Sequence, residues 1–191
     1  MSGKIVLVTG GARSGKSRFA EDYVTALGVK VAYIATAQVL DGEMARRVTL
    51  HQSRRPVEWQ TYEAPFGAAQ ILREAVSVAG AVLFDCLTVY TTNLMLSPEA
   101  PATPEGRCRF VQEQIAALLQ SAKTQPSTVV FVTNEVGMGI VPDNALAREF
   151  RDLAGLVNQQ VAAAADEVYL TISGLAVEIK KLAIVIDNAK S

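Results

Sequence analysis

A glycine-rich segment near the N-terminus has the residue types and spacing of a phosphate-binding loop. The segment is Gly10-Gly11-Ala12-Arg13-Ser14-Gly15-Lys16-Ser17, which fits the pattern G-x-x-x-x-G-K-[ST]. Glycines let backbone N–H groups point at phosphate oxygens, and a helix that begins after the loop adds the positive end of its dipole. We expect Lys16 to reach the β- and γ-phosphates of a nucleoside triphosphate and Ser17 to ligate Mg²⁺. The alternative is a glycine-rich turn with an incidental lysine.

An acidic residue in the middle of the chain is a candidate partner for the same metal ion. Asp85 follows the apolar run Ala81–Phe84, which is typical of a buried strand that ends in a carboxylate. At the carboxyl end of a parallel strand, an acid lies beside the mouth of the phosphate loop and can hold magnesium through water. Apolar runs that end in Asp are common, so Asp85 can also be an ordinary strand-end or capping residue.

The single histidine, His51, lies among arginines. Arg46 and Arg47 precede it, and Arg54 and Arg55 follow it. If this stretch is helical, Arg47 and His51 are neighbours on one face. Nearby cations disfavour imidazolium, so we expect a neutral imidazole, which is a competent nucleophile toward phosphorus, beside guanidinium groups that pair with phosphate oxygens. The alternative is a solvated basic helix with an incidental histidine.

These residues have to be positioned by a regular scaffold, and β-rich runs alternate with helical patterns along the chain. The expected strands are Lys4–Thr9, Val31–Thr36, Ala81–Asp85, Thr128–Thr133 and Val168–Ile172. Helical patterns cover about residues 16–27, 42–52, 65–78, 107–122 and 144–165, and three prolines mark residues 97–104 as a surface loop. Continuously apolar strands are typical of a parallel sheet that is covered by helices on both faces. The sequence therefore predicts an α/β fold with a mostly parallel central sheet flanked by helices.

Length and composition favour one compact globular domain. With the phosphate loop, we expect a single nucleotide-binding catalytic domain over residues 1–191, with an ambiguous tail at residues 181–191. The formal net charge is −1, so no strong basic field indicates nucleic acid. No apolar stretch is long enough to span a bilayer and no signal peptide is recognisable, so we expect a cytoplasmic protein. Cys86 and Cys108 are widely separated, and we interpret both as reduced thiols rather than zinc ligands.

Several segments occur in an order that resembles the bifunctional adenosylcobinamide kinase / adenosylcobinamide-phosphate guanylyltransferase family of cobalamin biosynthesis. They are the phosphate loop, YIATA at residues 33–37, Glu43-Met44 with His51, TNEVGMGIVP at residues 133–142, and VNQ at residues 157–159 ahead of AAAADEV at residues 162–168. The likeness extends from about Ile5 to Lys180, and TNEVGMGIVP is its most specific segment. The proline-rich loop and the residues after Lys180 carry no motif of the family.

The resemblance implies a P-loop NTPase fold of the RecA-like kind and two reactions. In the first, the γ-phosphoryl group of ATP or GTP moves to the aminopropanol hydroxyl of adenosylcobinamide. In the second, GMP moves from GTP to the resulting phosphate by way of a guanylylated histidine, which corresponds to His51. Mg²⁺ accompanies the nucleotide. The implied nucleotide contacts are Gly10 to Ser17, Ala35, Thr36, Ala37, Gln52, Ser53, Arg54, Arg55, Glu63 and Asp85, with Lys16 and His51 as catalytic residues.

The resemblance also suggests roles for residues outside the loop. Glu63 is placed to bind a ribose hydroxyl or the guanine edge, or it is a surface acid at a strand end. Asn134 and Glu135 end a predicted strand, and we hypothesise that they position the corrinoid or the attacking oxygen; alternatively, residues 134–142 only shape a turn. The family is described as trimeric, so we expect a homo-oligomer whose other partners are small-molecule substrates.

Two other functions are compatible with the phosphate loop. A simple P-loop kinase of a small metabolite would use Lys16, Ser17 and Asp85 but would form no covalent nucleotide, and His51 would then be structural. A nucleotide-dependent switch or scaffold would act through a protein partner. No N-K-x-D guanine-specificity motif follows a predicted strand, which argues against the second of these functions.

Overall fold

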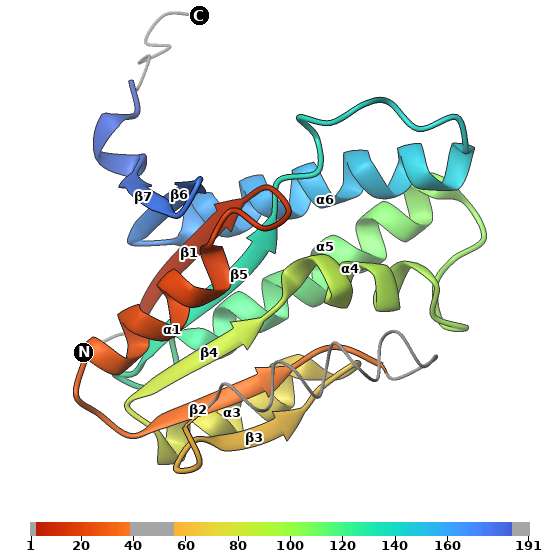
Figure 1. The fold of residues 1–191 in the computed structure, drawn as a ribbon. Coiled ribbons are helices and arrows are strands. Elements are labelled where there is room, and N and C mark those ends of the chain that lie inside the picture. Colours follow the sequence, from red (N-terminus) through yellow and green to blue (C-terminus); the bar gives the residue numbers. More distant parts are fainter. Residues whose placement is uncertain (1–2, 39–55, 185–191) are drawn as a thin grey trace, which may run out of the picture.

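The computed structural model describes residues 3–38 and 56–184, which form a seven-stranded sheet with the order β3-β2-β4-β5-β1-β6-β7 (Figure 1). The strands are β1 (Lys4–Gly10), β2 (Val31–Ala35), β3 (Gln60–Glu63), β4 (Ala81–Asp85), β5 (Thr128–Asn134), β6 (Glu167–Ile172) and β7 (Leu175–Glu178). Neighbouring strands are parallel except β6 and β7, which form an antiparallel hairpin. The predicted mostly parallel sheet is therefore confirmed.

Helices cover both faces of this sheet (Figure 1). Helix α1 (Lys16–Ala26) packs on one face. The other face carries α3 (Ala68–Val78), α4 (Leu87–Met95), α5 (Pro104–Ala122) and α6 (Ala145–Ala164), and a 3₁₀ turn, η1 (Lys180–Leu182), follows β7. Among the described residues, we find no helix with the length and hydropathy of a transmembrane segment.

The apolar runs of the central strands explain why they are buried from both sides. Along β1, Ile5 and Leu7 pack into the layer of α3 to α6, whereas Val6 and Val8 pack against the α1 side. All four side chains are at most 1% exposed. Side chains alternate between the two faces of a strand, so a strand needs apolar residues at every position when both faces are covered.

The predicted elements are present with small shifts at their ends, except the helix predicted at residues 42–52, which lies outside the described residues. Helix α5 begins at Pro104 rather than at 107, because the Thr103 hydroxyl caps it by accepting the N–H of Gly106 at 3.2 Å and proline suits the first helical position. Gly28 ends α1 as predicted, with a φ of 64° just after the helix.

Three elements were not predicted as such: β3, α4 and β7. Strand β3 is short and mostly exposed, and β7 is a four-residue edge strand, so neither contains a buried apolar run. Helix α4 contains three threonines and a valine among its nine residues, and these residue types favour strands over helices. Its helical state is stabilised by burial, since Leu87 and Tyr90 are fully buried in the core.

Polar and charged side chains around Glu167 connect the N-terminal ends of β1 and β6, at the end of the strands opposite the phosphate loop. The Lys4 amine donates to Glu167 Oε1 at 2.6 Å, and the Tyr23 and Tyr169 hydroxyls donate to Glu167 Oε2 at 2.7 and 3.1 Å. Burial opposes ionisation of this carboxyl, but the hydrogen bonds from Lys4, Tyr23 and Tyr169 together lower the pKa of Glu167 below its usual value.

We predict that Glu167→Gln destabilises the protein by about 1–2 kcal/mol at pH 7, because a partly buried carboxylate with three donors is lost. A lowered folded-state pKa means that this contribution is full above the unfolded-state value of about 4.3 and is lost as the pH falls through the folded-state value. The difference from wild type should therefore shrink below about pH 4. Urea denaturation at several pH values measures it, with the exposed Glu113→Gln as the control. A difference that persists unchanged at low pH would contradict the assignment.

Candidate functional site

The phosphate loop connects β1 to α1 with the backbone geometry that its glycines permit. Gly15 has a φ of 96° and immediately precedes α1, and Arg13 has a φ of 57°. The loop closes on itself through a hydrogen bond from the Ser14 N–H to Gly11 O at 3.2 Å. The first N–H groups of α1 have no partner within the helix, so they face the loop as an anion-binding end.

The hairpin of β6 and β7 braces this loop from one side. Ser14 Oγ and Thr171 Oγ1 are 2.8 Å apart, and the Gly174 N–H donates to Ser14 O at 2.8 Å. A Cβ atom at Gly10 would lie 2.4 Å from Thr171 Oγ1, and one at Gly15 would lie 3.0 Å from Gly174 Cα. Glycine is therefore required at both loop positions, because a side chain would push the loop away from the hairpin.

Lys16 lies over the loop in a partly buried position. Its Nζ donates to Gly11 O at 3.1 Å. Burial lowers the pKa of Lys16, while the nearby Cys86 and Asp85 oppose this effect. Burial also raises the pKa of the Cys86 thiol to about 12, with a further contribution from Asp85. Cys86 is therefore a neutral thiol near pH 7 and supplies no negative charge beside Lys16.

Asp85 ends β4, one strand away from β5 and two from β1. Its Oδ2 accepts a hydrogen bond from the Tyr33 hydroxyl at 3.0 Å. Among the described residues, no hydrogen bond to the other carboxylate oxygen or to the Ser17 hydroxyl is recorded. Hard oxygen ligands of this kind suit Mg²⁺. The described residues contain no group of three or more His, Cys, Asp or Glu side chains that could hold a metal ion by itself. A magnesium ion at Asp85 and Ser17 would therefore also need phosphate or water ligands.

Thr36 fixes the chain just after Asp85. Its hydroxyl donates to Cys86 O and accepts from the Cys86 N–H, both at 2.9 Å, while its own N–H donates to Asp85 O at 3.3 Å. Its carbonyl accepts the Asn93 amide at 2.8 Å, and the same amide also reaches Pro65 O. Thr36 is fully buried, so these contacts give it a supporting position. A nucleotide contact by Thr36 stays a prediction.

A buried polar network supports the end of β5. The Thr133 hydroxyl donates to Asn158 Oδ1 at 2.7 Å, and the Asn158 amide donates to Asn134 O at 3.2 Å. Thr88 Oγ1 accepts the Asn134 N–H at 2.7 Å. The next residue, Glu135, donates its N–H to Gly10 O at 3.1 Å. The start of the TNEVGMGIVP segment is therefore joined directly to the first residue of the phosphate loop.

The structure brings together at one sheet edge most of the predicted site residues that it describes: Gly10 to Ser17, Ala35 to Ala37 and Asp85. Glu63 is exposed at the end of β3, in register with Ala35. His51, Gln52, Ser53, Arg54 and Arg55 lie outside the described residues. Sequence reasoning did not identify Tyr33, Asn93, Thr88 and Thr171 as supporting residues. Their side chains act through partners distant in sequence, so no local pattern indicated these contacts, although Tyr33 belongs to the YIATA segment.

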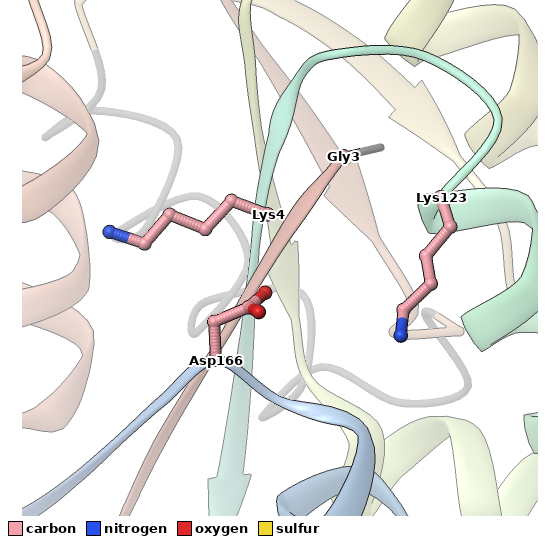
Figure 2. A pocket seen from close by; sticks show the side chains of 4 residues that line it. All are labelled: Gly3, Lys4, Lys123 and Asp166. Carbon is pink, nitrogen blue, oxygen red and sulfur yellow. The ribbon is translucent and has the colours of Figure 1, made fainter. Parts of the chain in front are cut away.

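A cavity of about 310 Å³ lies away from this edge, lined by Gly3, Lys4, Lys123 and Asp166. Figure 2 shows the amines of the two lysines on opposite sides of the Asp166 carboxylate. Asp166 Oδ2 accepts the Ile5 N–H at 2.7 Å, and the Lys4 amine is bound to Glu167 and Tyr23. The Asp166 carboxylate and the Lys4 amine already have structural partners, so the end of the sheet that carries the phosphate loop is the better candidate for a reaction site.

Comparisons with known proteins agree with the geometry of this edge. Residues 6–179 match the family described as "Cobinamide kinase / cobinamide phosphate guanyltransferase". The chain is 46% identical to the "Bifunctional adenosylcobalamin biosynthesis protein CobU" of Salmonella typhimurium over 181 residues, which cover 92% of this chain and 99% of that protein. It is 44% identical to the protein of the same name from Escherichia coli, with the same coverage. It is 41% identical to the "Bifunctional adenosylcobalamin biosynthesis protein CobP" of Pseudomonas aeruginosa, over 91% of this chain and 96% of that protein. The chain therefore belongs to the cobinamide kinase / cobinamide phosphate guanyltransferase family.

Proposed function

We propose that this chain is a bifunctional transferase that phosphorylates adenosylcobinamide and then guanylylates the resulting phosphate. The observation that carries the proposal is the phosphate loop braced beside Asp85, in a chain that matches this family over residues 6–179. Family membership supplies the identity of the acceptor, and the loop supplies the site for the nucleoside triphosphate.

In the first reaction, the aminopropanol hydroxyl oxygen attacks the γ-phosphorus of ATP or GTP. The bond from that phosphorus to the β–γ bridging oxygen breaks, the nucleoside diphosphate leaves with the electron pair, and the hydroxyl loses its proton. The backbone N–H groups of residues 10–17 would hold the triphosphate, and the Lys16 amine would stabilise charge that develops on the β–γ bridge.

In the second reaction, an imidazole nitrogen of His51 attacks the α-phosphorus of GTP, and the α–β bridging oxygen leaves with pyrophosphate. An oxygen of adenosylcobinamide phosphate then attacks the same phosphorus. The P–N bond breaks, its electron pair returns to the imidazole, and adenosylcobinamide-GDP is released. Division of the transfer into two displacements is ordinary covalent catalysis, and Arg54 and Arg55 would pair with the phosphate oxygens.

Ser17 and Asp85 would hold a magnesium ion at the phosphates. Their oxygens are of the type that Mg²⁺ prefers, and Tyr33 keeps the Asp85 carboxylate oriented through its 3.0 Å hydrogen bond. The bound ion would neutralise part of the charge on the triphosphate. For the remaining nucleotide contacts we propose Ala35, Thr36, Ala37, Gln52, Ser53 and Glu63, with Glu63 at the ribose or the guanine edge.

We further propose that the chain acts in the cytoplasm as one catalytic domain and assembles as a homo-oligomer, for which the family resemblance suggests a trimer. Its other partners would be the small-molecule substrates GTP, ATP, adenosylcobinamide and adenosylcobinamide phosphate.

We predict that His51→Ala abolishes covalent labelling by GTP carrying a labelled α-phosphate, with a loss of at least about 1000-fold, because the attacking nitrogen is removed. The wild-type label should be acid-labile and alkali-stable, as a P–N bond requires. Phosphorylation of adenosylcobinamide by the variant should stay within about threefold of wild type, which also checks that it folds. Label retained in His51→Ala would exclude His51 as the nucleophile, and a wild-type protein without label would favour a simple kinase.

We predict that Lys16→Met lowers the rates of both reactions by about 100-fold or more, since one cation serves the triphosphate in each. Lys30→Met is the matched control, because Lys30 is exposed and immediately precedes β2, at the N-terminal end of the strands and away from the phosphate loop. Rates of phosphoryl transfer and of His51 labelling are measured at saturating corrinoid and GTP. An effect on only one of the two activities would show that the reactions do not share the phosphate loop.

A further inference from the structure

The loop that follows β5 starts beside the phosphate loop and exposes apolar side chains. Met138 is 85% exposed, Ile140 is 96% exposed and Val141 is 57% exposed. Single apolar residues on a surface are ordinary, but a contiguous exposed group commonly marks a place where a ligand or partner binds. Three such side chains within four positions form what we call the apolar loop, residues 136–141.

Two arginines of α6 donate hydrogen bonds to backbone carbonyls of the apolar loop and of the two residues that follow it. Arg148 donates to Pro142 O at 3.0 Å and to Asp143 O at 2.7 Å, and Arg151 donates to Gly137 O. At the root of the loop, Glu135 Oε1 accepts the Gly137 N–H at 3.3 Å. These hydrogen bonds fix the backbone on both sides of Met138 and Ile140, whose side chains stay exposed. The exposed apolar side chains therefore belong to a segment whose backbone is hydrogen-bonded to α6.

The position of the loop in the sheet relates it to the reaction. Strand β5 lies between β1, which leads into the phosphate loop, and β4, which ends in Asp85. The Glu135 N–H contacts Gly10 O at 3.1 Å. The root of the apolar loop therefore adjoins the first residue of the phosphate loop, so an arm of a molecule bound on the apolar loop could extend to the triphosphate.

We infer that the apolar loop is the platform for the corrin macrocycle of the acceptor, with Met138 and Ile140 as its contact residues. The inference rests on the proposed function, which provides the corrinoid. A corrin macrocycle is large and carries methyl groups on its faces, so it can cover aliphatic side chains while its amide arms remain in water. Contact with these residues would hold the macrocycle while its aminopropanol arm extends to the phosphates.

The test uses the full-length protein with Met138→Ser, Ile140→Ser and the double variant. Val78→Ser is the matched control, because Val78 is also an exposed aliphatic residue, 48% exposed, at the end of α3 away from the phosphate loop. The KM for adenosylcobinamide is measured in the phosphorylation reaction, and His51 labelling by GTP is measured without corrinoid. Light scattering reports the oligomeric state of each variant.

Loss of one aliphatic contact should raise the KM for adenosylcobinamide by about 10-fold, and the double variant should raise it by 30-fold or more. The rate at saturating corrinoid, the labelling by GTP and the oligomeric state should stay close to wild type. An unchanged KM would overturn the inference. So would a parallel loss of GTP labelling, which would assign the loop to the nucleotide site, or a changed oligomeric state, which would assign it to a second copy of the chain.

These outcomes separate the inference from the proposed function. If wild-type protein phosphorylates adenosylcobinamide and the loop variants do so with unchanged KM, only the platform is wrong. If wild-type protein fails to transfer phosphate to adenosylcobinamide, the proposed function is wrong, and the inference that the apolar loop binds the corrin macrocycle is wrong as well.

Discussion

The close contact between the phosphate loop and the β6–β7 hairpin is the constraint on which the site depends. Ser14 is held on both its hydroxyl and its carbonyl, by Thr171 and by the Gly174 N–H. A loop that must surround phosphate oxygens has few side chains with which to fix itself, because most of its positions are glycine or are turned toward the ligand. The hairpin supplies that rigidity from outside, and preorganised N–H groups lose little freedom when an anion binds.

The same edge of the sheet is fixed a second time around Asp85. Thr36 and Asn93 connect the chain after β2 to the chain after β4, and Tyr33 orients the carboxylate. The network of Thr88, Thr133 and Asn158 does the same for the end of β5. Parallel strands bring these ends together, but the hydrogen bonds determine how each end leaves the sheet. The site is thus built from strand ends that are individually secured.

The parts of this arrangement that were predictable from sequence are those with a local signal. The phosphate loop, the start of α1 and the buried runs of β1, β4 and β5 each combine a short motif with an apolar pattern. Strand β7 and helix α4 could not be predicted in this way. The first is a short edge strand, and the second owes its helical state to the burial of Leu87 and Tyr90 rather than to propensity. The contact between Ser14 and Thr171 joins residues 157 positions apart, so only the folded chain reveals it. The role predicted for His51 concerns a residue outside the described part of the chain, and it stays a prediction.

The double hydrogen bond of Thr36 also limits which side chains this position can accept. Valine has nearly the shape of threonine and would fill the same space in the core. It could neither donate to the carbonyl of Cys86 nor accept from its N–H, so the N–H next to the acidic end of β4 would lose its partner, while the carbonyl would keep only the Tyr90 N–H at 3.1 Å. A position that looks aliphatic by volume therefore depends on its hydroxyl, and substitution tables based on size and hydropathy would misjudge it.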